Sequence, residues 1–163
     1  MTTLLILVLL AGQTPKAEEA KKAEKPIPDD FKIVATSFGE FTSAKPWTST
    51  ITADGKALQK THVGTMKIEK ESKLSPADLR DLLDQVEKAE FSKLKKDYTY
   101  SISDNHHLIL EITANKKTHK VEVYAFDRVK EKDDVDRFLT VFREVLKKVP
   151  SPNEDETPDA YKR

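Results

Sequence analysis

The sequence predicts an α+β domain, a mainly antiparallel sheet of about five strands with two helices packed on one face, in the order βββαββα. Two observations carry this prediction. The strand-like runs are joined by short links, which favours hairpins and antiparallel pairing. The two helical runs are each apolar along one side only, so both can cover the same sheet face.

The first three strands are predicted from β-branched and aromatic runs in the first half of the chain. They span Phe31–Phe38, Trp47–Ala53 and His62–Glu69. Asp54-Gly55 separates the second run from Lys56–Gln59, and this pair is typical of a type I′ hairpin turn, in which both central residues have positive φ.

The first helix begins at a capping sequence. Ser75 supplies an N-cap hydroxyl, Pro76 fits the first helical position, and Asp78 can return a hydrogen bond to the cap. The apolar stripe that follows comprises Leu79, Leu82, Leu83, Val86 and Ala89.

A second hairpin and a second helix complete the predicted domain. The strands are His107–Thr113, with Leu108, Leu110 and Ile112 inward, and Thr118–Ala125, with Val121 and Val123 inward. Asn115-Lys116 forms the turn between them. The helix spans 133–149, with acids in its first turn and lysines in its last, which complements the helix dipole.

The ends of the chain predict an exported protein. Residues 1–15 resemble a signal peptide, because an apolar run from Leu4 to Leu10 exits through Ala11 and Gly12 and is too short to span a bilayer. Residues 16–30 form a flexible Ala/Glu/Lys/Pro linker, residues 31–149 a single domain, and residues 150–163 a disordered acidic tail with prolines. The expected location is periplasmic or extracellular, without membrane insertion once the leader is removed. The alternative is a weak anchor formed by an uncleaved leader.

Several features together resemble a family of uncharacterised bacterial exported domains over about residues 31–153. They are Ile51–Gly55, the capped helix from Ser75 followed by Phe91, Asp104 after a Tyr-containing loop, the paired strands from Leu108 and Val121, and Val149–Asn153. This resemblance implies the fold and no assigned activity or catalytic residue.

Composition argues against several chemistries. The 28 basic and 28 acidic residues balance, which gives no electrostatic footprint for nucleic acid, and the chain has no cysteine for a disulfide, thiol nucleophile or thiolate-bound metal. No phosphate-binding glycine loop or nucleophile elbow is present. We therefore predict no enzyme, catalytic residue, cofactor or metal.

The leading interpretation is a non-enzymatic binding module of the cell envelope that takes a protein, peptide or glycan partner. Its predicted binding surface comprises Phe41, Trp47, Tyr98 and Tyr100, since aromatic side chains are common binding anchors.

Two other classes remain open. One is a metal-dependent or acid/base enzyme using His107, His119 and Asp104, in which the two histidines share the outer sheet face and Glu111 is a further possible ligand. The other is a membrane-tethered structural module. The other two histidines of the chain, His62 and His106, have no assigned role in either class.

Overall fold

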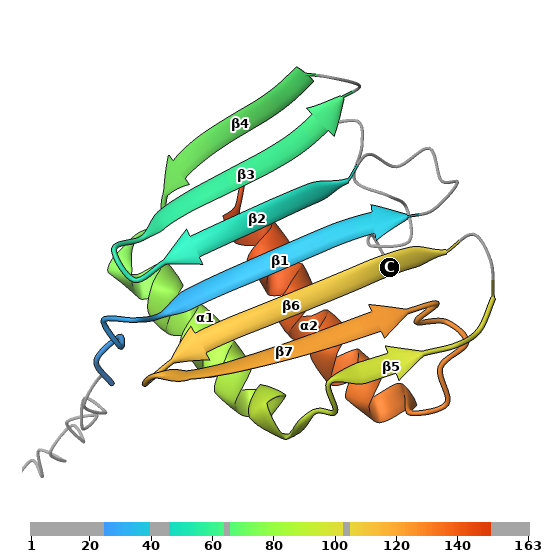
Figure 1. Cartoon of the computed structure of the whole chain (residues 1–163). Coiled ribbons are helices and arrows are strands. Elements are labelled where there is room, and N and C mark those ends of the chain that lie inside the picture. The colour runs from blue at the N-terminus through green and yellow to red at the C-terminus, as the bar shows by residue number, and fades with distance from the viewer. Residues whose placement is uncertain (1–24, 40–45, 64–65, 103–104, 151–163) are drawn as a thin grey trace, which may run out of the picture.

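The computed structural model describes residues 25–39, 46–63, 66–102 and 105–150. They form a seven-stranded sheet in the order β4-β3-β2-β1-β6-β7-β5, with both helices behind one face (Figure 1). The strands are β1 Lys32–Gly39, β2 Trp47–Thr52, β3 Lys56–Val63, β4 Met66–Lys73, β5 Asp97–Thr99, β6 His106–Ala114 and β7 Lys117–Tyr124. The helices are α1 Pro76–Lys88 and α2 Lys132–Lys148, and a single 3-10 turn, η1, covers Phe91–Lys93.

The α+β class with two helices is confirmed, whereas the predicted strand count and order are wrong. The predicted strand 62–69 is divided between the end of β3 and the start of β4. β4 is rich in Lys and Glu because it is an edge strand that buries few side chains. Its sequence therefore lacks the apolar alternation from which strands are predicted. β5 has only three residues and pairs in parallel with β7, so the sheet is mixed.

The core fills the space between the helices and the inner face of the sheet, which we define as the face turned toward α1 and α2. Every second residue of each central strand points there, as alternation requires. The inner face contributes Ile33, Ala35, Ile51, Ala57, Leu108, Leu110, Ile112, Val121 and Val123, all buried. Leu79 and Leu82 of α1 and Phe138 and Phe142 of α2 pack against it from the helix side.

The β2–β3 turn differs from the predicted type I′ turn. Only Gly55 has positive φ, at 85°, and its N–H donates to Thr52 O at 2.8 Å. The loop is therefore a three-residue connection with glycine in the left-handed position. The Asp54 carboxylate accepts from the Thr52 hydroxyl at 2.6 Å and from Lys56 N at 3.2 Å, which braces the turn.

The predicted capping box of α1 is confirmed. Ser75 Oγ accepts from Asp78 N at 3.1 Å, and Asp78 Oδ2 accepts from Ser75 N at 3.2 Å. Asp78 also pairs with Lys148 near the end of α2. The cap thus joins the start of one helix to the end of the other.

The segment before β1 lies against the domain. Ile27 packs on the core, and the Asp30 carboxylate accepts from Asn115 N at 2.9 Å and Lys116 N at 2.5 Å in the β6–β7 turn. Residues 25–30, the last part of the predicted linker, are therefore in contact with the folded domain. The predicted signal peptide, the rest of the linker and residues 151–163 lie outside the described residues.

Candidate functional site

The outer face of the sheet, which we define as the face turned away from both helices, is covered by neither α1 nor α2 (Figure 1). Residues that alternate with the core positions point there. From β1 and β2 they are Val34, Thr36, Phe38, Thr48, Thr50 and Thr52, all of intermediate burial. Lys32 points the same way but is exposed at the start of β1. Apart from Lys32, β1 and β2 thus present an uncharged strip of threonines and apolar side chains on the outer face.

Three rings stack across one end of the outer face, and we call them the ring row. Phe38 of β1, His107 of β6 and Tyr124 of β7 stand opposite one another in the strand register. The Phe38 and His107 centroids are 4.5 Å apart with planes at 6°, and those of His107 and Tyr124 are 4.2 Å apart at 29°. The imidazole therefore lies between two aromatic rings.

Hydrogen bonds fix the polar atoms of the ring row. His107 Nδ1 lies 2.9 Å from Glu122 Oε1, and these side chains are 22% and 32% exposed. Tyr124 Oη donates to Ile102 O at 2.7 Å and accepts from Asn105 N at 3.3 Å. The tyrosine thereby ties the loop that follows β5 to the end of the sheet.

That loop carries the two exposed large apolar side chains found in the described residues. Tyr100 is 43% exposed and Ile102 is 37% exposed. Since Tyr124 holds Ile102 O, this apolar loop is joined directly to the ring row. The ring row and the loop make this end of the outer face rich in rings and apolar groups.

Charge on the outer face separates by side. Over β3 and β4, four lysines stand beside two glutamates, and we call this the basic half: Lys56, Lys60, Lys67, Lys73, Glu69 and Glu71. Over β6, β7 and β5, three carboxylates stand beside one lysine, and we call this the acidic half: Glu111, Glu122, Asp97 and Lys120. The uncharged strip of β1 and β2 separates the two halves.

The predicted aromatic binding surface does not form as one patch. Trp47 points to the inner face, with its ring centroid 5.8 Å from that of Phe142 in α2. Tyr98 is only 2% exposed, so it is not available to a partner. Tyr100 is exposed, and Phe41 lies outside the described residues.

Tyr98 instead anchors the start of α2. Its hydroxyl donates to Asp134 Oδ2 at 2.7 Å and accepts from Lys95 N at 2.7 Å. Burial, followed by the Asp134 contact, raises the pKa of Tyr98. The hydrogen bond from Arg137, followed by that from Tyr98, lowers the pKa of Asp134.

The expected pairing of His107 with His119 on the outer face is wrong. Val121 and Val123 are buried on the inner face, and alternation by two takes His119 to that same face. His119 Nε2 lies 2.9 Å from Leu94 O, and its ring meets Phe91 edge-on. Asp104 lies outside the described residues, which contain no group of three His, Asp or Glu able to hold a metal ion.

The remaining members of the ring row escaped sequence reasoning. Phe38 ends one predicted strand, Tyr124 is the last residue but one of another, and alternation places both on the outer face. Their contact through His107 depends on the pairing of β1 with β6, two strands far apart in the chain. Only the register, which a single sequence does not supply, brings the three rings together.

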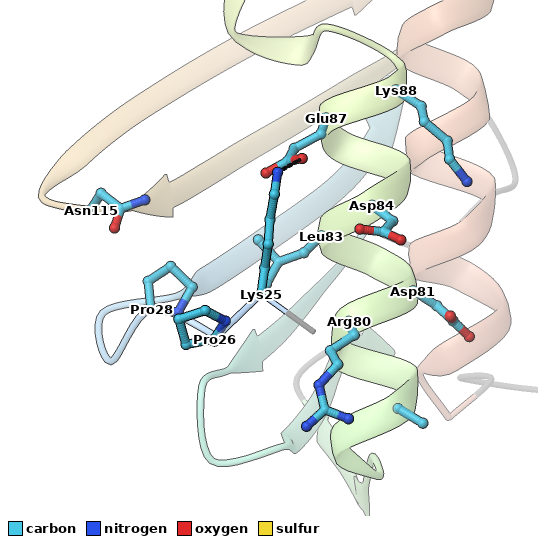
Figure 2. A pocket seen from close by; sticks show the side chains of 11 residues that line it. Lys25, Pro26, Pro28, Arg80, Asp81, Leu83, Asp84, Glu87, Lys88 and Asn115 are labelled. Atoms are coloured by element: carbon cyan, nitrogen blue, oxygen red, sulfur yellow. Dashed lines mark hydrogen bonds and ion pairs between the residues drawn. The ribbon is translucent and has the colours of Figure 1, made fainter. Parts of the chain in front are cut away.

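On the other side of the sheet, a groove lies between residues 25–28 and α1 (Figure 2). This open groove has a volume of about 630 Å³ and is lined by Pro26, Pro28, Leu83 and charged side chains of α1. Lys25 Nζ already pairs with Glu87 Oε2 at 2.5 Å across it, and this hydrogen bond raises the pKa of Lys25. With charges of both signs and an internal ion pair, the groove favours no one ligand chemistry.

A family model described as a domain of unknown function, DUF6438, matches residues 46–146, which is more than half of the chain. The chain belongs to the DUF6438 family. The match begins just before β2 and ends within α2, so it includes six strands of the sheet, and β1 precedes it. The expected membership of a family without assigned activity is confirmed at that level, while a bacterial and exported origin stays a prediction.

No curated protein matches this DUF6438 chain. Neither α1 nor α2 is long and apolar enough to cross a membrane, and the same holds for every helix in the described residues.

Proposed function

We propose that this DUF6438 protein is an exported, non-enzymatic interaction module of the cell envelope, and that the outer face of its sheet is the surface that binds. The proposal rests chiefly on the ring row. Three rings held together by stacking, with hydrogen bonds at His107 and Tyr124, stand on the sheet face opposite the helices.

The three side chains of the ring row are already fixed in one conformation, which favours binding. A side chain that is free in the unbound protein loses rotamer freedom when a partner covers it, and this costs about 0.5–1.5 kcal/mol. Phe38, His107 and Tyr124 are already held in place by one another. A partner that covers these three side chains therefore binds with little further loss of side-chain entropy.

A second candidate function follows from the contact between His107 and Glu122. A carboxylate that accepts from Nδ1–H directs the lone pair of Nε2 outward, as in a general base. Under this alternative, a panel of ester and phosphoester substrates would reveal turnover that His107→Gln abolishes. Under the interaction proposal, the chain and His107→Gln give the same background rate.

The absence of cysteine from the sequence permits a direct test. Thr50→Cys places one thiol on the outer face, and Thr140→Cys places one on the exposed side of α2 as a matched control. Each variant is treated with a small charged maleimide that does not cross the cytoplasmic membrane, both in intact cells and as dilute purified protein.

We expect labelling of the thiol at position 50 to be at least about tenfold slower in cells than in dilute solution, because a bound partner shields the outer face, whereas the α2 control reacts equally in both. Equal rates at position 50 would contradict the interaction surface. An α2 control that reacts only after the cells are lysed would contradict export.

A further inference from the structure

We infer that the partner on the outer face is a second copy of this chain, packed face to face about a twofold axis that runs along β1. The inference rests on the proposed function, since it names the occupant of the same surface. Three properties of the outer face support it: the separation of charge, the uncharged centre and the area.

The charge separation is self-complementary. β3 and β7 each lie two strands from β1, on opposite sides. Rotation about an axis along β1 exchanges these sides, so the basic half of one copy covers the acidic half of the other. A face with charges of one sign, or with both signs intermingled, would place like charges opposite one another after this rotation and would not attract its copy.

The register identifies the pair that meets. One row across the sheet runs Lys60, Thr48, Thr36, Ile109 and Glu122, each opposite the next in the strand pairing. The twofold axis through Thr36 therefore sets Lys60 of one copy against Glu122 of the other. The same contact occurs twice in the dimer.

Apart from Lys32, which is exposed at the start of β1, the centre of the proposed interface carries no charge. Val34, Thr36, Thr48 and Thr50 lie along β1 and β2, and Ile109 lies beside them on β6. Burial of these side chains leaves no unpaired ion, which would be costly. An apolar and neutral centre with charged margins is the usual composition of a protein interface.

The area is sufficient for a stable dimer. The seven strands comprise 50 residues, which at about 3.3 Å per residue and about 4.8 Å per strand cover roughly 790 Å², against about 800 Å² per partner in a standard interface. Stacked sheets align within about 30° of one another, so the axis lies within about 15° of β1. The long Lys60 and Glu122 side chains span the resulting displacement.

The test uses charge reversal on the full chain, followed by sedimentation equilibrium. We expect a dimer at about 10 µM, since interfaces of this size bind with micromolar or tighter Kd. Lys60→Glu and Glu122→Lys should each weaken self-association at least about tenfold, because each places two like-charge contacts in the dimer. Lys88→Glu, on the exposed side of α1, is the control and should leave it unchanged.

Mixing the two reversed variants gives the decisive result. In the mixed dimer, the glutamate introduced at position 60 of one chain faces the lysine introduced at position 122 of the other, and the second contact keeps the original pair. We therefore expect the mixture to dimerise about as tightly as the unmodified chain, although each variant alone does so weakly. Urea midpoints close to that of the unmodified chain establish that both variants fold.

Three outcomes separate this inference from the proposed function. A dimer that tolerates both reversals, or a mixture that stays monomeric, overturns the second copy as partner. A chain that is monomeric at about 100 µM, while the thiol at position 50 is shielded in cells, overturns the second copy and keeps the interaction module. Failure of the proposed function itself shows instead as an unshielded thiol at position 50 in cells.

Discussion

At Gly55 the surrounding backbone leaves no space for a side chain larger than hydrogen. A Cβ built there would lie 2.6 Å from Leu74 O, and φ is 85°. We expect Gly55→Ala to destabilise the domain by about 1–3 kcal/mol, the usual cost of a strained backbone residue. Urea unfolding measures it.

Lys116 supplies the matched comparison, because it also has positive φ, at 61°, but carries a side chain. Lys116→Gly should be neutral or stabilise by up to about 1 kcal/mol, since glycine adopts this conformation without steric cost. Destabilisation by Lys116→Gly together with a silent Gly55→Ala would show that neither backbone conformation persists in solution.

Phe142 is one of two fully buried phenylalanines on the core side of α2. It is fully buried, with its ring 5.6 Å from Phe138 and 5.8 Å from Trp47. Phe142→Ala should cost about 3–5 kcal/mol, the range for truncating a buried phenylalanine. Thr50→Ala, on the outer face, should stay near about 0.5 kcal/mol in the same urea experiment. A nearly silent Phe142→Ala would mean that α2 is peripheral to the core.

Among the elements, the link between the two helices depends on pH through Asp78. The hydrogen bond from Lys148, then those from Ser75, lower the pKa of Asp78 to about 2. In the unfolded chain an aspartate has a pKa of about 3.9, so the contribution of Asp78 to stability is complete above about pH 4 and is lost as the pH falls through about 2.

We therefore expect Asp78→Asn to make stability fall less steeply than in the unmodified chain between about pH 4 and pH 2. Lys148→Gln should have the same effect, because Lys148 is the main cause of the lowered pKa. Thermal unfolding in a series of acidic buffers measures both slopes. Slopes equal to that of the unmodified chain would exclude this ion pair as a source of acid sensitivity.

The elements also show which patterns a single sequence carries. The capping box at Ser75 and the apolar stripes of α1 and α2 were predictable, since each depends on residues close in the chain. β4 and β5 were not, because a charged edge strand and a three-residue parallel strand have no apolar periodicity. The ring row was predictable residue by residue as outer-face positions, but its assembly depends on the β1–β6 register.

For the whole molecule, the first prediction concerns the leader. The apolar run Leu4–Leu10 with its small-residue exit predicts cleavage between about Ala11 and Ala17. Intact mass of the protein from its native envelope should therefore lack residues 1–10. A mass that retains them would contradict cleavage and favour the anchored alternative.

The order of the sheet has a consequence for synthesis. Among the described strands β1 is made first, yet it occupies the middle of the sheet and needs β6, which ends at Ala114, on its second side. While residues 32–105 emerge, β1 to β4 can pair as neighbours, but one edge of β1 stays open, and such non-local pairing slows folding. We expect a chain ending at residue 102 to aggregate through this edge, as unpaired strands do. Light scattering would reveal it, and a monodisperse fragment would show that another segment protects the nascent strand.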